Sequence, residues 1–222
     1  MSAPAASYLD LDHWPRRDAF EYFRGFDKPY FNVCTKLDVA RLKQALAEQR
    51  VGNLSLAYHF IALRLANRIE AFRLRLEDAR VRVHPLVHGS ATVLRADDSF
   101  GFADLDLDRH DEGFAAFATR AAAAIAATRA GRLPFEPKPE DAARIHFTTL
   151  PWLHFTSFSH ARNWGREDSV PKLAFGRIDA DGARAWMPLS VEVHHALMDG
   201  LHVGQFVQGF EAALQDPMAW LS

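Results

Sequence analysis

Apolar side chains recur along this chain with two different spacings, and these spacings predict its secondary structure. Recurrence every three or four residues, as at Phe20 and Phe23, indicates one face of an α-helix. Short runs rich in aromatic and β-branched residues predict β-strands. Helices are expected at residues 16–24, 39–50, 55–78 and 111–130, and from about Gly200 onward. Strands are expected at residues 30–39, 80–87, 91–95, 145–150, 172–178 and 186–195.

Three local signals refine this pattern. Asp38 stands where its carboxylate could cap the following helix, and Gly131 stands where a helix would end. The proline-rich stretch 132–140 is expected to be a loop, too short to separate two domains. Strands and helices alternate without a strict βαβ order. We therefore predict a mixed α/β (α+β) fold with a single domain over residues 1–222, whose last long strand ends at two histidines.

Composition excludes several classes of protein. The 222 residues are 49% hydrophobic, enough for a large core, and 24% are charged, which is not the composition of a disordered chain. The formal net charge of −2 offers no general attraction for nucleic acid or an anionic membrane, so neither is expected as a partner. The one cysteine, Cys34, allows no intrachain disulfide and no cysteine-built zinc cluster.

The chain shows no sign of a membrane or export signal. Its start lacks the basic residues and apolar run of a signal peptide. No stretch of about 18 apolar residues could form a transmembrane helix. A cytoplasmic protein is therefore expected.

Eleven histidines raise the question of chemistry, and the densest polar cluster among them is HHALMDG at 194–200. Neighbouring residues on a strand point to opposite faces, so His194 and His195 should not act as a pair. His195 could be a base at a strand end or a buried structural histidine. Asp199 could simply cap the last helix. A metal site of His195, Asp199 and His202 lacks a familiar ligand spacing, so no metal is expected.

The histidine cluster lies within the longer segment PLSVEVHHALMDGLHVGQF at 188–206. This segment, together with other motifs along nearly the whole chain, resembles the chloramphenicol acetyltransferase family. Its His-x-x-x-Asp-Gly core also occurs in dihydrolipoyl acyltransferases and condensation domains. WPRRDAFE at 14–21 is similar to the opening of the family. TTLPW at 148–152 and FTSF at 155–158 are similar to a later segment of it. Condensation domains are about twice this size, and no lipoyl domain is present, so the first family is favoured.

This resemblance implies a fold and an assembly. The implied fold is a two-layer sandwich, in which helices pack on one face of a mixed β-sheet. The implied assembly is a homotrimer with each active site between two subunits. Acetyl-CoA and a small-molecule acceptor are the implied substrates, and no permanently bound cofactor is expected.

The resemblance also implies four catalytic residues. His195 would be the general base that takes a proton from the acceptor hydroxyl, with direct transfer and no acyl-enzyme. Asp199 would pair with Arg16 as structural support. Thr148 takes the place of a family serine that donates a hydrogen bond to the oxygen of the tetrahedral state.

Further positions are implied for substrate binding. An apolar pocket would hold the acceptor. Its candidate residues are Phe23, Phe31, Phe100, Phe135, Phe158 and His160. Arg177 is the candidate cation for a phosphate of CoA, with a solvated strand end as the alternative.

The chain departs from the family pattern mainly on the acceptor side. Pro29 and Ala174 replace pocket residues of the family, and residues 159–163 do not reproduce the family segment. The leading hypothesis is acetylation of chloramphenicol. The alternative is a CoA-dependent acyltransferase of the same fold that acts on another small hydroxyl or amine compound. A non-catalytic binding or assembly protein is a third reading, which the four intact catalytic positions oppose.

Overall fold

The computed structural model describes residues 7–50, 52–131, 143–162 and 168–221. The strands are β1 (Ser7–Tyr8), β2 (Tyr30–Asp38), β3 (Leu74–Glu77), β4 (Arg80–Val83), β5 (His88–Leu94), β6 (Phe100–Leu105), β7 (Arg144–Leu150), β8 (Lys172–Gly176), β9 (Asp179–Asp181) and β10 (Arg184–His194). The helices are α1 (Arg17–Arg24), α2 (Ala40–Gln49), α3 (Leu54–Arg68), α4 (Phe114–Ala130), α5 (Gly200–Gln215), α6 (Met218–Leu221) and a 3₁₀ turn, η1 (Glu70–Arg73). None of these helices is long and apolar enough to cross a membrane.

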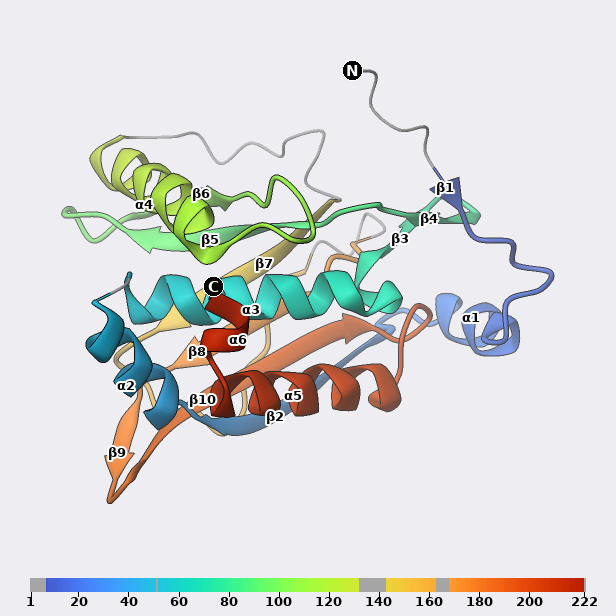
Figure 1. Cartoon of the computed structure of the whole chain (residues 1–222). Coiled ribbons are helices and arrows are strands. Elements are labelled where there is room, and N and C mark those ends of the chain that lie inside the picture. Colours follow the sequence, from blue (N-terminus) through green and yellow to red (C-terminus); the bar gives the residue numbers. More distant parts are fainter. Residues whose placement is uncertain (1–6, 51, 132–142, 163–167, 222) are drawn as a thin grey trace.

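A mixed sheet forms the centre of the molecule (Figure 1). Its strands follow the order β2-β10-β8-β7-β5-β6, and β9 pairs with β10. β7 runs parallel to β5 and β8, whereas the other neighbours are antiparallel. A second, three-stranded sheet has the order β1-β4-β3. The predicted mixed α/β class and the mixed sheet are confirmed.

The two faces of β10 have different surroundings. Met187, Val191 and Val193 are fully buried and belong to the same apolar core as the residues of α3 and α5. Alternate residues point the other way, because side chains on a strand alternate between its faces. This second face carries Ser190, Glu192 and His194, and we call it the polar face. Helices α3 and α5 lie over the core face in Figure 1.

The helix predicted at 55–78 is wrong over its last ten residues. Helix α3 ends at Arg68, and Ile69 is in an extended conformation with φ −105° and ψ 106°. Leu74 and Leu76 then alternate with Arg75 and Glu77 along β3, which pairs with β4. Because a short apolar segment fits either periodicity, only the pairing with β4 distinguishes strand from helix here.

Other predicted elements differ at their ends. The strand predicted at 80–87 stops at Val83, close to Pro85, which has no N–H for a ladder. Asp38 accepts a hydrogen bond from the N–H of Ala40 at 3.0 Å, although Val39 occupies the cap position of α2. Gly131 follows α4, as predicted. Strand β6 was not predicted, and the loop 132–140 lies outside the described residues.

Candidate active site

His195 follows the last residue of β10 and is held by contacts on both sides. Its N–H donates to the carbonyl oxygen of Pro29 at 2.7 Å, which joins it to the start of β2. Its ring stacks on Phe23 with 3.8 Å between centroids and an angle of 6° between planes. Phe31 touches the ring from another side at 4.6 Å. Two aromatic rings therefore fix the orientation of the imidazole.

One ring nitrogen of His195 is buried inside the protein. Nδ1 is buried, and within the described ranges no hydrogen-bond partner meets it. The residue as a whole is only half-buried. A proton acceptor must lie within hydrogen-bond reach of the group that it deprotonates. Such a role for His195 would leave Nε2, rather than the buried Nδ1, as the acceptor.

Arg16 binds the turn that follows His195. Its Nε donates to Asp199 Oδ2 at 3.1 Å, and its other nitrogens donate to the carbonyl oxygens of His195 and Ala196 at 3.2 and 3.1 Å. Burial alone would raise the pKa of Asp199. His202, the N–H of Leu201 and Arg16 together outweigh burial and lower this pKa. The carboxylate is therefore ionised, and the guanidinium fork fixes the turn.

Asp199 also caps helix α5. Its Oδ1 accepts the N–H of Leu201 at 3.0 Å, while the N–H of Asp199 donates to Nδ1 of His202 at 3.2 Å. This reciprocal arrangement is a capping box. The two readings of Asp199, ion pair with Arg16 and helix cap, hold at the same time. The same residue thus joins the strand end to the helix start.

Thr148 is far from His195 within one chain. It pairs with Ala174 on β8, and Ala174 pairs with Ser190 on β10. Paired residues share a face, so Thr148 points to the polar face. His195 follows Ser190 by five residues, roughly 16 Å along an extended strand. One chain therefore does not bring the hydroxyl of Thr148 to the imidazole of His195.

The predicted acceptor residues fall into separate places. Phe23 and Phe31 lie against His195. Phe158 and His160 contact each other, with 4.7 Å between ring centroids, in the segment that follows β7. Phe100 is 45% exposed on β6, at the other edge of the sheet from β2. Phe135 lies outside the described residues.

His160 is anchored to β10 rather than to His195. Its N–H donates to Glu192 Oε2 at 3.1 Å, and its side chain is 9% exposed. Burial lowers the pKa of His160 to about 4, so the ring is neutral near pH 7. Both ring nitrogens are buried without a hydrogen-bond partner in the described part of the chain.

Arg177 is already engaged at the surface. Its Nε and Nη2 donate to the two carboxylate oxygens of Asp179 at 2.9 and 3.3 Å. Both side chains are about half exposed, so water competes for this pair and its net contribution is small. A phosphate group would have to displace Asp179 to bind Arg177 through this fork.

Sequence reasoning missed a buried ion pair next to the site. Arg162 Nε donates to Glu192 Oε1 at 2.8 Å, and their side chains are 2% and 6% exposed. The signal was a carboxylate between Val191 and Val193 in an apolar strand, because such a charge needs a buried partner. Its partner could not be named, since Arg162 lies 30 residues earlier in the chain.

The structure contains a cleft and lacks a recognisable metal cluster within its described part. Among those residues, no group of three or more His, Cys, Asp or Glu side chains is placed to hold a metal ion. Arg16, Leu197 and His202 are among the residues that line a cleft of about 460 Å³. Neither His195 nor Thr148 lines this cleft.

Two solved acetyltransferase structures resemble this chain in fold. Dihydrolipoamide acetyltransferase of Azotobacter vinelandii superposes with a TM-score of 0.66 over 100% of this chain and 94% of its own, at 16% identity. A solved chloramphenicol acetyltransferase superposes with a TM-score of 0.80 over 95% of this chain and 100% of its own, at 23% identity. The chain therefore has the same fold as these two acetyltransferases.

Sequence comparison is more specific than this likeness in fold. The family model for chloramphenicol acetyltransferase matches residues 5–211. A chloramphenicol acetyltransferase of Streptomyces acrimycini is 31% identical, over 98% of both chains. Chloramphenicol acetyltransferase 2 of Escherichia coli is 29% identical, over 90% of this chain and 92% of its own. The chain belongs to the chloramphenicol acetyltransferase family, which is a family of enzymes.

Proposed function

We propose that this protein transfers the acetyl group of acetyl-CoA to a hydroxyl group of chloramphenicol. The observation that carries the proposal is the fixed orientation of His195. Its ring stacks on Phe23, and Arg16 binds the turn that follows it. An alcohol is a weak nucleophile near neutral pH, and a fixed imidazole within reach can take its proton as it attacks.

The proposed reaction is a direct transfer. Nε2 of His195 accepts the hydroxyl proton while the oxygen attacks the thioester carbonyl carbon. The tetrahedral intermediate then breaks its carbon–sulfur bond, and the departing thiolate takes the proton from the imidazolium. Thr148 donates a hydrogen bond to the negative oxygen of the intermediate, which contributes a few kcal/mol.

The reaction requires that His195 of one chain meet Thr148 of another. The separation of these residues within one chain supports this arrangement. A closed ring of identical subunits repeats one such contact at every interface. Each chain therefore contributes His195 to one site and Thr148 to a neighbouring site. The proposed assembly is the homotrimer that the family resemblance implies.

Each substrate has a proposed binding surface. The acceptor contacts the aromatic rings beside His195 and, from the second chain, Phe158 and His160. Phe100 and Phe135 are further candidates for the acceptor wall. Arg177 binds a phosphate of CoA after exchange with Asp179.

An assay of thiol release tests the function. Purified protein is mixed with acetyl-CoA and chloramphenicol, and free CoA thiol is measured with a chromogenic disulfide. Release that depends on both substrates, with acetylated chloramphenicol as the product, is the expected result. No acceptor-dependent release at saturating acetyl-CoA would reject chloramphenicol as the substrate.

A second candidate is transfer to another small hydroxyl or amine compound. It is favoured by the polar, buried ring of His160 beside Phe158, because an unpartnered buried polar group selects ligands that satisfy it. The same assay with a panel of alcohols and amines separates the candidates. A better kcat/KM for one of these compounds than for chloramphenicol would establish the second.

A further inference from the structure

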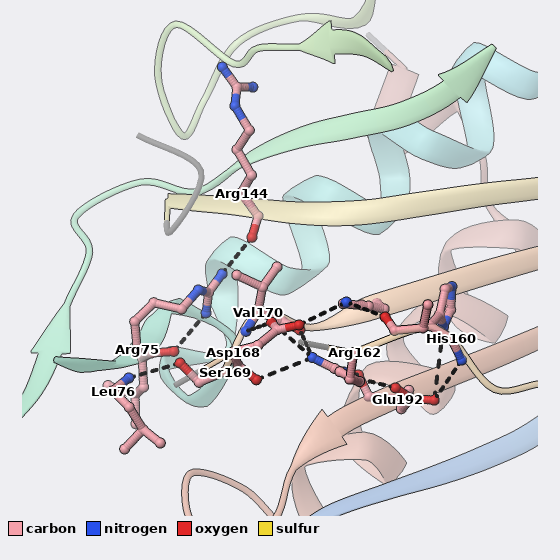
Figure 2. A network of polar contacts seen from close by, with 12 residues as sticks. Arg75, Leu76, Arg144, His160, Arg162, Asp168, Ser169, Val170 and Glu192 are labelled. Atoms are coloured by element: carbon pink, nitrogen blue, oxygen red, sulfur yellow. Dashed lines mark hydrogen bonds and ion pairs between the residues drawn. The ribbon is translucent and has the colours of Figure 1, made fainter. Parts of the chain in front are cut away.

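Arg162 lies at the centre of a buried polar network on the polar face of the sheet (Figure 2). Besides its bond to Glu192, its Nη1 donates to Asp168 Oδ1 at 3.1 Å and to the carbonyl oxygen of Val170 at 2.9 Å. Its Nη2 lies 3.5 Å from the carbonyl oxygen of Glu192. The planar fork of an arginine makes this set of bonds, which a lysine cannot reproduce.

Each carboxylate of this network has a cationic partner. Lys172 Nζ donates to Asp168 Oδ2 at 2.9 Å, so two cations face the two carboxylates of Asp168 and Glu192. Burial alone would raise the pKa of Asp168, but Arg162 and Lys172 lower it, and the carboxylate stays ionised. Buried ion pairs add little net stability compared with apolar packing. The distinctive effect of this network is therefore to fix the positions of the chain segments that it joins.

The network reaches the start of β2 and the end of β10, which meet beside His195. The guanidinium of Arg162 lies over the ring of Tyr30, 4.3 Å from its centroid, and Tyr30 pairs with His194. Tyr30 stands between Pro29, whose carbonyl accepts the N–H of His195, and Phe31, whose ring touches the imidazole. On β10, Arg162 holds Glu192. One side chain thus fixes the ends of β2 and β10 relative to each other.

We propose that Arg162 is a positioning residue for His195. It acts from the opposite face of the sheet by fixing the two strand ends, so that the imidazole keeps its stacking on Phe23. This inference rests on the general-base role of His195 in the proposed function. A base that is displaced by about 1 Å can lose up to 100-fold in rate, so the effect is visible in turnover.

The substitution Arg162→Lys tests the proposal, because it keeps the charge and removes the fork. The expected result is a loss of kcat of roughly 10- to 100-fold. The KM for acetyl-CoA stays within about twofold, since no CoA contact is altered. Arg120→Lys is the control: Arg120 lies on helix α4, far along the chain from the site, and pairs with buried Glu112. This control keeps wild-type kcat.

A second readout does not depend on the function. The ring protons of His195, assigned by comparison with His195→Ala, are expected to carry a ring-current shift because the ring stacks on Phe23. In NMR spectra these resonances move toward ordinary histidine values in Arg162→Lys and stay in place in Arg120→Lys. If the wild type does not turn over chloramphenicol, the proposed function fails, and these resonances still decide the role of Arg162.

A second variant keeps the proposal testable if Arg162→Lys does not fold. In that case Glu192→Gln is measured in the same way, since it keeps the shape of Glu192 and weakens its hold on Arg162. It is expected to shift the His195 resonances in the same direction. Unchanged His195 resonances and wild-type kcat in a folded variant would overturn the proposal.

Discussion

At the scale of single residues, the neighbours His194 and His195 have different environments. His194 is 4% exposed, and its Nδ1 accepts the N–H of Ala196 at 3.2 Å. Burial, followed by the charge of Arg162, lowers the pKa of His194 to about 4. The ring of His195 instead remains partly accessible between two phenylalanines. The alternation of side chains along a strand produces this difference.

This difference predicts unequal effects of removing the two rings. His195→Ala is expected to lower turnover by roughly 10²- to 10⁴-fold, because it removes the proton acceptor. His194→Ala leaves the proton acceptor His195 in place, and it is expected to act chiefly by lowering the stability of the fold. Thiol-release kinetics on both variants, with thermal unfolding as a check of folding, measure the difference. Equal losses of kcat in two folded variants would mean that the base is assigned wrongly.

Four buried histidines predict how stability depends on pH. Burial, as the largest cause, lowers their pKa values from 6.5 to about 4; they are His59, His84, His160 and His194. Below about pH 6.5 the unfolded chain binds protons that the folded chain does not. The free energy of unfolding is therefore highest above pH 6.5 and falls toward pH 4. Urea unfolding at a series of pH values measures this slope.

His59 offers a matched test of that slope. Its ring packs against Phe147 and Phe175, at 4.9 and 5.2 Å between centroids, and its Nδ1 donates to the carbonyl oxygen of Ser55. His59→Phe keeps an aromatic ring there and removes one titrating group. The slope between pH 6.5 and 4 is expected to decrease in this variant. A free energy of unfolding that is flat over this range in the wild type would contradict the interpretation.

At the scale of elements, the junction from β10 to α5 depends on Asp199. Its two oxygens have separate partners, the guanidinium of Arg16 and the first turn of α5. The side chain is 39% exposed, so the ion pair is partly hydrated and weaker than a fully buried one. The helix cap and the ion pair are therefore expected to contribute similar amounts to the free energy of unfolding.

Two substitutions separate these contributions. Asp199→Asn keeps a capping oxygen and loses the charge, with an expected destabilisation of about 1 kcal/mol. Asp199→Ala loses both, with an expected destabilisation of about 2 kcal/mol. Urea unfolding measures both values. Equal destabilisation by the two variants would show that the cap contributes nothing at this junction.

The elements also show the limit of sequence periodicity. The pattern predicted α1, α4 and α5 closely, because each has an apolar face of its own and a clear end signal. Residues 74–77 were assigned to a helix because Leu74 and Leu76 continue an apolar segment. Their strand conformation depends on pairing with β4. Such pairing is tertiary information, which a local window does not contain.

At the scale of the whole molecule, the candidate catalytic residues lie apart. His195 stands at one end of β10, and Thr148 stands on the polar face two strands away. Motif matching gave both positions but not their separation. If the site forms between subunits, two inactive variants should complement each other.

Mixed assemblies test this expectation. Chains with His195→Ala and chains with Thr148→Ala are co-expressed, and hetero-oligomers are purified with two different tags. In every mixed trimer one interface of three carries both intact residues, so activity rises to about a third of the wild-type level. Light scattering is expected to give the mass of a trimer. Activity no higher than that of the two variants alone would refute a shared site.

The sequence by itself determined those features that depend on neighbours in the chain. The amphipathic helices, the strand before His195 and the spacing from His195 to Asp199 could all be read from residues within one or two turns of each other. The family motifs also lie in short segments. These local patterns were enough to predict the fold class and the candidate base.

Only the tertiary structure decided which distant segments meet. It supplied the contacts of the Arg16–Asp199 pair that the family resemblance implies, separated Thr148 from His195, and gave Glu192 its buried partner Arg162. The physical reason is that strand register and burial are set by pairing between remote segments. A buried charge in the sequence indicates that a partner must exist, whereas the register of the sheet determines which residue it is.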